Sequence, residues 1–254
     1  LGGIGIDINM GCCAPEIVRQ GAGIAWMLKD NAETQQMLKM VRNAVPLDMR
    51  LSVKMRLGDE DYNMKKLCNF VDMLVSEGVS QIVLHPRTKK AKFKRPPHWN
   101  DAETLFEYVQ KKYDKKICCC INGDIVDFES LNNVQKLVPL SDGFMIGRAA
   151  VQKPWLFGVL SQKLQGIIPE EKSEQTVDSM ELVKEFLVNL KECQPEDFWM
   201  TRAARFFAYF CNNFGFAHYL FTQINNAKDL DGMEQAFSAY LEKMSGERFL
   251  NIYK

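Results

Sequence analysis

The chain has 254 residues, of which 46% are hydrophobic and 25% charged, and its formal net charge is zero. This composition is ordinary for a globular protein, and the longest apolar runs fall far short of the roughly 20 residues that cross a bilayer. We therefore expect a cytoplasmic protein with no membrane association, built as one large domain or as one large and one small domain.

The eight cysteines favour reduced thiols rather than a disulfide framework. They occur in runs (Cys12-Cys13 and Cys118-Cys119-Cys120) and within apolar stretches, and no C-x-x-C pair has zinc spacing. Adjacent cysteines bridge poorly, so we expect mostly buried, reduced thiols and no metal site.

The first part of the chain alternates short apolar runs with amphipathic stretches. Continuous apolar runs are typical of strands buried on both faces, and strand–helix alternation predicts a parallel sheet with right-handed crossovers. The predicted strands are Ile4–Ile8, Leu51–Met55, Gln81–Leu84, Ile117–Ile121 and Gly143–Ile146. The predicted helices are Ala14–Lys29, Ala32–Val45, Met64–Glu77, Ala102–Lys112 and Phe128–Val138.

The spacing between these strands is typical of a barrel with helices outside. A closed (β/α)8 TIM barrel needs eight strands, and five are visible here. Either the sheet is open, or the sequence lacks the first three units. We favour the second interpretation, in which the visible strands are strands 4–8 of an α/β barrel.

After Pro154-Trp155-Leu156-Phe157 the pattern becomes helical. We predict a partial barrel domain over residues 1–160, a polar linker over 161–175, and a small all-α helical domain over 176–254. Either Asp229 or Asp231 could cap the last helix. From Glu170 onward the chain carries 14 acidic and 9 basic residues.

Polar residues follow four successive predicted strands. Charged residues are costly to bury inside strands unless they are paired, and carboxyl ends of barrel strands are where sites form. Each residue alone has an ordinary interpretation: Lys54 as a solvated or paired lysine, His85 as a satisfied core histidine. Together they predict one pocket, with these residues around it: Lys54, Arg56, His85, Arg87, Asn122, Gly123, Asp124, Gly147 and Arg148.

The last two of these units predict a phosphate site. Asn122-Gly123-Asp124 allows close backbone approach, and Gly147-Arg148 precedes a short predicted helix. Backbone N–H groups with one arginine bind phosphate well, and barrels commonly hold phosphates after their last two strands. Taken singly, each glycine is more simply an ordinary turn.

A reactive cysteine is the second element of the predicted site. Cys12 follows Asn9-Met10-Gly11 where a strand ends and a helical segment begins. A cysteine next to another cysteine is more often a packing residue than a reactive one, but the position of Cys12 favours a reactive thiol.

A basic run, Arg87–Arg95, holds six basic residues and no acidic residue, with Phe93 among them. Such a run is commonly a solvated loop. Beside a pocket that takes a base from folded RNA, it could bind phosphates.

Five motifs in order resemble the dihydrouridine synthase family, flavin enzymes that reduce uridine in transfer RNA. The motifs are DINMGC (Asp7–Cys12), VKMRLG (Val53–Gly58), HPRT (His85–Thr88), INGDI (Ile121–Ile125) and IGRAAVQKPWLF (Ile146–Phe157). The C-terminal helices resemble that family's RNA-binding domain more weakly. Cys13 stands where the family usually has proline, and gapless matching through Gly23-Ile24-Ala25 keeps Cys12 at the acid position.

The resemblance implies specific roles. Cys12 would protonate C5 of uracil while FMN delivers hydride to C6, and NADPH would reduce the flavin. Asn9 would face the flavin and the base, and Lys54 and His85 would contact the isoalloxazine ring. Residues Asn122, Gly123, Asp124, Gly147 and Arg148 would hold the FMN phosphate and ribitol. For the tRNA substrate we expect contacts from Asn9, Arg56, Arg87, Lys89, Lys90 and Lys92, in a protein that acts as a monomer.

Two other functions remain open at this level. One is a flavin oxidoreductase acting on a free pyrimidine or another small molecule, which would give the helical domain and the basic loop no role. The other is an RNA-binding protein without chemistry, which would bind no flavin and be colourless.

Overall fold

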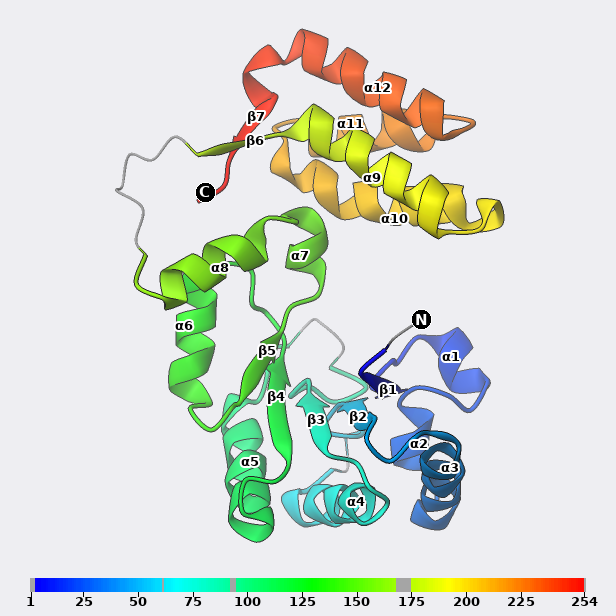
Figure 1. The fold of residues 1–254 in the computed structure, drawn as a ribbon, viewed down its shortest axis with the longest axis vertical. Coiled ribbons are helices and arrows are strands. Elements are labelled where there is room, and N and C mark those ends of the chain that lie inside the picture. The colour runs from blue at the N-terminus through cyan, green and yellow to red at the C-terminus, as the bar shows by residue number, and fades with distance from the viewer. Residues whose placement is uncertain (1–2, 61, 92–94, 168–174, 254) are drawn as a thin grey trace. The chain divides into compact units, whose positions relative to one another are not determined.

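The protein divides into two compact units. The structure, a computed structural model, describes residues 3–60, 62–91, 95–167 and 175–253. The first unit comprises residues 1–125 and 129–146, and the second comprises 126–128 and 147–254 (Figure 1).

The first unit is built on a five-stranded parallel sheet whose strand order follows the chain, β1-β2-β3-β4-β5. This confirms the predicted strand–helix alternation, and the strand bounds differ from the prediction by at most two residues. The strands are β1 (Gly5–Met10), β2 (Arg50–Met55), β3 (Gln81–Leu84), β4 (Cys118–Asn122) and β5 (Gly143–Met145).

Six helices belong to this part of the chain. In Figure 1, α3, α4 and α5 follow one another along one side of the sheet. The predicted single helix over Ala14–Lys29 is wrong, because Gly21 and Gly23 adopt φ of +71° and +61° and interrupt it. The helices are α1 (Pro15–Arg19), α2 (Ala25–Leu28), α3 (Asn31–Ala44), α4 (Met64–Ser76), α5 (Trp99–Tyr113) and α6 (Phe128–Leu137).

The two faces of the sheet differ in character. Side chains alternate along a strand, so Leu51, Val53 and Met55 share one face of β2, and all three are fully buried. The opposite face carries most of the polar side chains. The predicted burial of both faces holds for β3, where Ile82, Val83 and Leu84 are buried, and is wrong for β1. The difference is largest at β1, the edge strand, where Ile6 is 40% exposed and Asp7 and Asn9 are exposed. The polar face carries Asp7, Asn9, Ser52, Lys54, Gln81, Cys118, Cys120 and Asn122.

All eight cysteines are free thiols, as predicted, but only Cys68, Cys119 and Cys211 are buried. Cys118 and Cys120 lie half-buried on the polar face with their sulfurs 3.7 Å apart. The prediction of mostly buried thiols therefore holds for fewer than half of them.

The second unit is a helical domain with an aromatic core. Phe207, Phe210 and Phe237 are fully buried, and the rings of Phe206 and Phe210 stack at 4.9 Å. Its helices are α7 (Arg148–Gln152), α8 (Leu156–Leu164), α9 (Ser179–Cys193), α10 (Trp199–Phe210), α11 (Ala217–Asn225) and α12 (Leu230–Lys243), with 3-10 turns at Glu196–Phe198, Cys211–Asn213 and Ser245–Glu247. The side chain of Asp229, rather than Asp231, caps α12 by accepting a hydrogen bond from the Gly232 amide at 2.7 Å.

The second unit begins earlier than the predicted helical domain. Asn213 donates a hydrogen bond of 2.6 Å from Nδ2 to the Gln152 carbonyl, and Trp155 packs against the aromatic core. Residues 147–160, which the sequence prediction assigned to the barrel domain, therefore belong with the helices. The predicted linker over 161–175 contains the last turn of α8, and its residues 168–174 lie outside the described part of the chain.

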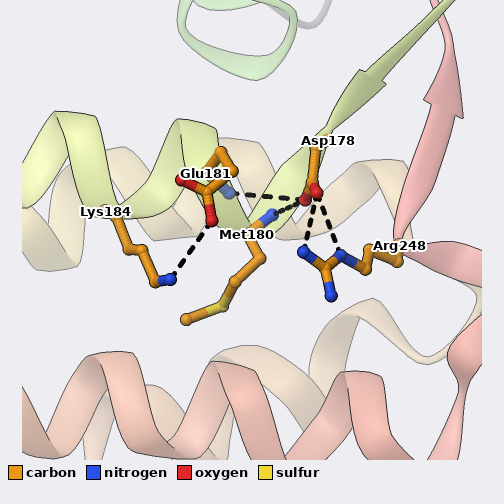
Figure 2. A network of polar contacts seen from close by, with 5 residues as sticks. All are labelled: Asp178, Met180, Glu181, Lys184 and Arg248. Carbon is orange, nitrogen blue, oxygen red and sulfur yellow. Dashed lines mark hydrogen bonds and ion pairs between the residues drawn. The ribbon is translucent and has the colours of Figure 1, made fainter.

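The predicted all-α domain over 176–254 also contains a short sheet, in which β6 (Thr176–Asp178) pairs antiparallel with β7 (Phe249–Asn251). Asp178 links this pair to α9, as Figure 2 shows. One carboxylate oxygen accepts from the Met180 and Glu181 amides at 2.9 and 3.4 Å. The other accepts from Nε and Nη2 of Arg248 at 3.0 and 2.8 Å.

We predict that Asp178→Ala lowers the free energy of unfolding of the second unit by about 1 to 2 kcal/mol, because it removes the helix cap and the ion pair. Asp178→Asn keeps the cap and should cost less than half as much. The measurement is urea unfolding of the full chain, followed by fluorescence of Trp155 and Trp199 in a background where Trp26 and Trp99 are phenylalanine.

The pH dependence has a defined sign. The hydrogen bond from Arg248 is the main reason that the pKa of Asp178 lies below its usual value. The stabilisation that the Asp178 carboxylate contributes is therefore present above the unfolded-state pKa of this group. It is lost as the pH falls through the folded-state pKa. Lys184→Met breaks an exposed ion pair with Glu181 and is the matched control, expected to change stability by under about 0.5 kcal/mol. Equal effects of Asp178→Ala and Lys184→Met would contradict the prediction.

Candidate functional site

The polar face of the sheet brings side chains from neighbouring strands to the same level. Asn9 pairs in register with Lys54, which pairs with Val83. Partners in a parallel ladder point to the same face, so Asn9 and Lys54 lie side by side. One step earlier on this face, Ser52 donates a 2.6 Å hydrogen bond from Oγ to the Asp7 carboxylate.

The turn that carries Cys12 is held by a side chain. Oδ1 of Asn9 accepts hydrogen bonds from the Gly11 and Cys12 amides at 3.1 and 3.0 Å. On the other side, the Cys12 carbonyl accepts from the Ile24 amide at 2.9 Å. Asn9 therefore fixes the position of Cys12, a role that the sequence prediction of a flavin- and base-facing residue did not include.

Lys54 is a partly desolvated cation next to this turn. Burial lowers its pKa, the positive charge of Arg56 lowers it further, and negative charge at Asp7 and Cys12 opposes both. Burial also lowers the pKa of Arg56, and the largest opposing influence is negative charge at Cys13, ahead of Cys12. Negative charge at Cys12 therefore acts on both cations, and negative charge at Cys13 acts on Arg56.

Two buried residues, His85 and Arg87, meet the more exposed Asp124 where β3 and β4 end. The Arg87 side chain is 4% exposed and donates to both oxygens of Asp124, at 3.0 Å from Nη1 and 2.5 Å from Nη2. Its Nε donates to the Arg95 carbonyl at 2.6 Å, and Nη1 lies 3.1 Å from Nε2 of His85. Each of the three guanidinium nitrogens thus has a partner within this chain.

The imidazole of His85 is neutral at physiological pH. It is 4% exposed, and burial is the first cause that lowers its pKa to about 3. The positive charges of Arg56, Lys54 and Arg87 lower it further, against the opposite effect of Asp124. A neutral imidazole has one donor and one acceptor nitrogen, so it can act as a hydrogen-bond donor without carrying charge.

Arg56 is the second buried arginine of the site. It donates from Nε to the Gly11 carbonyl at 2.9 Å and from Nη1 to the Thr88 carbonyl at 3.3 Å, and the residue is 4% exposed. From sequence, Arg56 and Arg87 were expected to contact RNA. The structure instead places both guanidinium groups inside the unit, where they join the ends of the strands, because backbone carbonyls and Asp124 satisfy them there.

The basic run reaches the neighbouring loop through ion pairs. Lys89 lies 3.1 Å from Asp59, and Lys90 lies 2.8 Å from Glu60, between the loops that follow β2 and β3. The Lys89 amide also donates to the Gly58 carbonyl at 2.8 Å. Lys92 and Phe93, which the sequence analysis placed in this basic run, lie outside the described residues.

The predicted phosphate residues fall into both units. In the first, Asn122 donates from Nδ2 to the Met145 carbonyl at 2.7 Å. Gly123 has a φ of +130°, and a Cβ there would lie 3.0 Å from Cδ2 of His85, so only glycine fits against the ring. Gly147 and Arg148 belong to the second unit, at the start of α7. Their assignment to a common phosphate site stays a prediction.

Asp7 and Ser52 lie on the polar face but were not among the predicted site residues. Asp7 raises the pKa of Lys54 and accepts a hydrogen bond from Ser52. A signal was present, since Asp7 stands two residues before Asn9 and therefore shares its face of the strand.

The described residues show neither a metal centre nor a membrane-spanning helix. No group of three or more histidine, cysteine or acidic side chains there is arranged to hold a metal ion. None of the helices in the same residues combines the length and the apolarity that crossing a bilayer requires.

Comparison with known proteins gives one consistent family. The family model described as dihydrouridine synthase matches residues 2–245. A tRNA-dihydrouridine(16) synthase of Pseudomonas syringae is 33% identical over 171 residues, covering 66% of this chain and 51% of that protein. A probable tRNA-dihydrouridine synthase of Rickettsia conorii is 31% identical, covering 71% of this chain and 51% of that protein. The chain thus spans about half the length of these relatives.

A longer match has lower identity. A tRNA-dihydrouridine(16) synthase of Neisseria meningitidis serogroup B is 26% identical over 243 residues, covering 94% of this chain and 69% of that protein. Among solved structures, one titled as a putative dihydrodipicolinate synthase family protein from Coccidioides immitis has a TM-score of 0.42 at 13% identity, covering 96% of this chain and 73% of that one. That likeness is too low to carry an argument.

We predict that Gly23→Ala destabilises the first unit by about 1 to 3 kcal/mol and displaces the Cys12 turn. Gly23 has a φ of +61°, and a Cβ there would lie 2.5 Å from the Cys12 carbonyl oxygen. The measurement is chemical denaturation together with the rate at which a thiol reagent modifies Cys12. Gly158→Ala is the control, because a Cβ at that helical position has nothing within 4 Å and should be neutral or stabilising. The same stability change in both variants would refute the argument.

Proposed function

The chain belongs to the dihydrouridine synthase family, and we propose that it reduces the C5–C6 double bond of a uridine in tRNA, with Cys12 as the proton donor. The observation that carries this proposal is the position of Cys12 at the carboxyl end of β1. There Asn9 fixes its turn and Lys54 lies in register on the same polar face. A fixed thiol next to a partly buried cation is suited to giving up a proton.

The donor set suits FMN. Lys54 and the neutral His85 are donors that an electron-rich isoalloxazine ring can accept from, and Gly123 lets the backbone approach closely beside them. We propose that Lys54 and His85 contact the ring, and that Asn122 and Gly123 serve its ribitol and phosphate. Asp124 acts through Arg87. When bound in its reduced form, FMN supplies the hydride that adds to C6 of uracil, and NADPH is the proposed external reductant.

The protein's own part in the chemistry is the proton. As hydride arrives at C6, Sγ–H of Cys12 breaks and its proton forms the new C–H bond at C5, so that two hydrogens add to the double bond. Cys12 is left as a thiolate. The thiolate and the Lys54 ammonium stabilise each other, consistent with the way negative charge at Cys12 raises the pKa of Lys54.

Access to C5 and C6 requires the uridine to leave the base stack. We propose that Lys89 and Lys90, with Lys92 in the same basic run, hold phosphates beside the extruded base. The ion pair between Lys90 and Glu60 is exposed, with side chains 67% and 54% accessible. Exposed ion pairs contribute about 0 to 1 kcal/mol, so a phosphate can displace Glu60 at little cost. The helical unit is the proposed second RNA-binding surface.

We also propose that the five parallel strands correspond to strands 4–8 of a (β/α)8 barrel. The support is the contrast between the two faces of the sheet. Apolar side chains lie under helices on one face, where a barrel packs its outer helices, and the opposite face carries the polar side chains of the candidate site.

We predict that Cys12→Ala in the full-length protein lowers dihydrouridine formation in tRNA by about 100-fold or more, because general acid catalysis contributes on that scale. The measurement is quantification of dihydrouridine in tRNA after single-turnover reaction. Cys13→Ala is the matched control and should keep most of the activity. Full activity of Cys12→Ala would refute the assigned role.

We predict opposite effects of two charge changes on tRNA affinity. Lys90→Gln should weaken binding and reduce the slope of log affinity against log salt by about 1, because one phosphate contact is lost. Glu60→Gln should strengthen binding, because it frees Lys90. Lys39→Gln on α3, paired with Glu77 at 3.9 Å, is the control with the same charge change. If Lys90→Gln and Lys39→Gln behave alike, the basic run is not the phosphate contact.

A further inference from the structure

We propose that Arg87 is a positioning residue that fixes His85 as the neutral tautomer protonated on Nδ1, and that Asp124 and the Arg95 carbonyl fix Arg87 in turn. This replaces the RNA-contacting role expected for Arg87 from the sequence. The inference deepens the proposed function, because its consequence concerns His85 as a cofactor contact, but the tautomer itself is a property of this chain alone.

The argument starts from the nature of the two groups. A guanidinium group donates hydrogen bonds and accepts none. Nη1 of Arg87 lies 3.1 Å from Nε2 of His85, so Nε2 must be the acceptor. A neutral imidazole carries one proton, and that proton must then be on Nδ1. In free histidine the Nε2-protonated form is the more populated one, so the arrangement selects the less common tautomer.

The guanidinium group has little freedom to rotate away from this position. Its fork is planar, and the two bonds to Asp124 fix both its plane and its direction. The bond from Nε to the Arg95 carbonyl fixes the third donor position. The side chain is 4% exposed, so water offers no competing partner at most of its surface.

The surroundings keep the imidazole neutral from every packed side. The charged groups that act on His85 are Arg56 and Lys54 from β2 and its loop, Arg87 from its own strand end, and Asp124 from the loop after β4. Three are cations, and the one anion already binds Arg87. The backbone of Gly123 lies close to the same ring, since a Cβ there would lie 3.3 Å from Nε2.

The consequence for the proposed reaction is directional. Nδ1 is then the ring nitrogen that carries the proton, and it keeps that proton over the whole physiological pH range. A group that accepts a hydrogen bond from the His85 ring, whether in this chain or in a cofactor, meets Nδ1 and not Nε2. Arg87 itself does not need to touch cofactor or substrate.

The test is nuclear magnetic resonance of the full chain labelled with 15N-histidine. The chain has three histidines, and single His98→Gln and His218→Gln variants assign the other two. Couplings from the ring carbons' hydrogens identify which nitrogen is protonated. We expect His85 to show Nδ1 protonated and Nε2 unprotonated, without change from pH 5 to pH 8. An Nε2-protonated His85, or a titration within that range, would overturn the proposal.

The role of Arg87 is tested by Arg87→Met. Without the donor, we expect the Nε2-protonated form to appear, and the pKa of His85 to rise by about 1 unit or more because a cation is lost and Asp124 is left uncompensated. If this variant does not fold, as judged from its amide spectrum, Arg87→Gln replaces it, because a side-chain amide can either donate to Nε2 or accept from it and should therefore give a mixture of tautomers. An unchanged Nδ1-protonated His85 in the folded variant would overturn the positioning role.

A failure of this inference can be distinguished from a failure of the proposed function. A wild-type His85 protonated on Nδ1, in a protein that forms no dihydrouridine, would remove the proposed function and leave this inference standing. Active protein with His85 protonated on Nε2 would do the reverse.

Discussion

The buried guanidinium groups of Arg56 and Arg87 join the strand ends from which the candidate site is built. Arg56 connects the turn after β1 to the loop after β3, and Arg87 connects the end of β3 to the loop after β4. Each charge would cost several kcal/mol to bury alone, and removal of one partner from such a pair typically costs 3 to 5 kcal/mol. The geometry of the candidate site at the end of this sheet thus depends on buried charges that donate hydrogen bonds to partners within the chain.

The sequence predicted which strands and helices occur, because hydrophobic periodicity is a local property. It could not show where Arg56 and Arg87 point. A cation at a strand end looks the same whether its partner is an RNA phosphate or Asp124, which lies 37 residues away in the chain. Burial of β1 failed for a related reason, since an apolar run does not reveal whether a strand lies at the edge or in the middle of a sheet. The break between α1 and α2 was in principle visible in Gly21 and Gly23.

The two units bury their apolar side chains in different ways. In the first, one face of a parallel sheet lies under helices and the other keeps its polar side chains. In the second, aromatic rings fill the space between helices, with Phe237 in contact with Phe207, Phe210 and Phe214. The helical domain boundary was misplaced in the sequence analysis because α7 and α8 are helical in either unit, and only long-range contacts such as Asn213 with Gln152 assign them.

The Asx turn at Asn9 affects which residues can occupy position 13. The hydrogen bonds that hold the turn, within the described residues, use the amides of Gly11, Cys12 and Ile24, and the amide of Cys13 takes part in none of them. A residue without an amide hydrogen can therefore occupy position 13 at no cost in backbone hydrogen bonding. Proline, usual in the resembling family, and cysteine, present here, are then exchangeable in a single evolutionary lineage while the neighbouring thiol keeps its place.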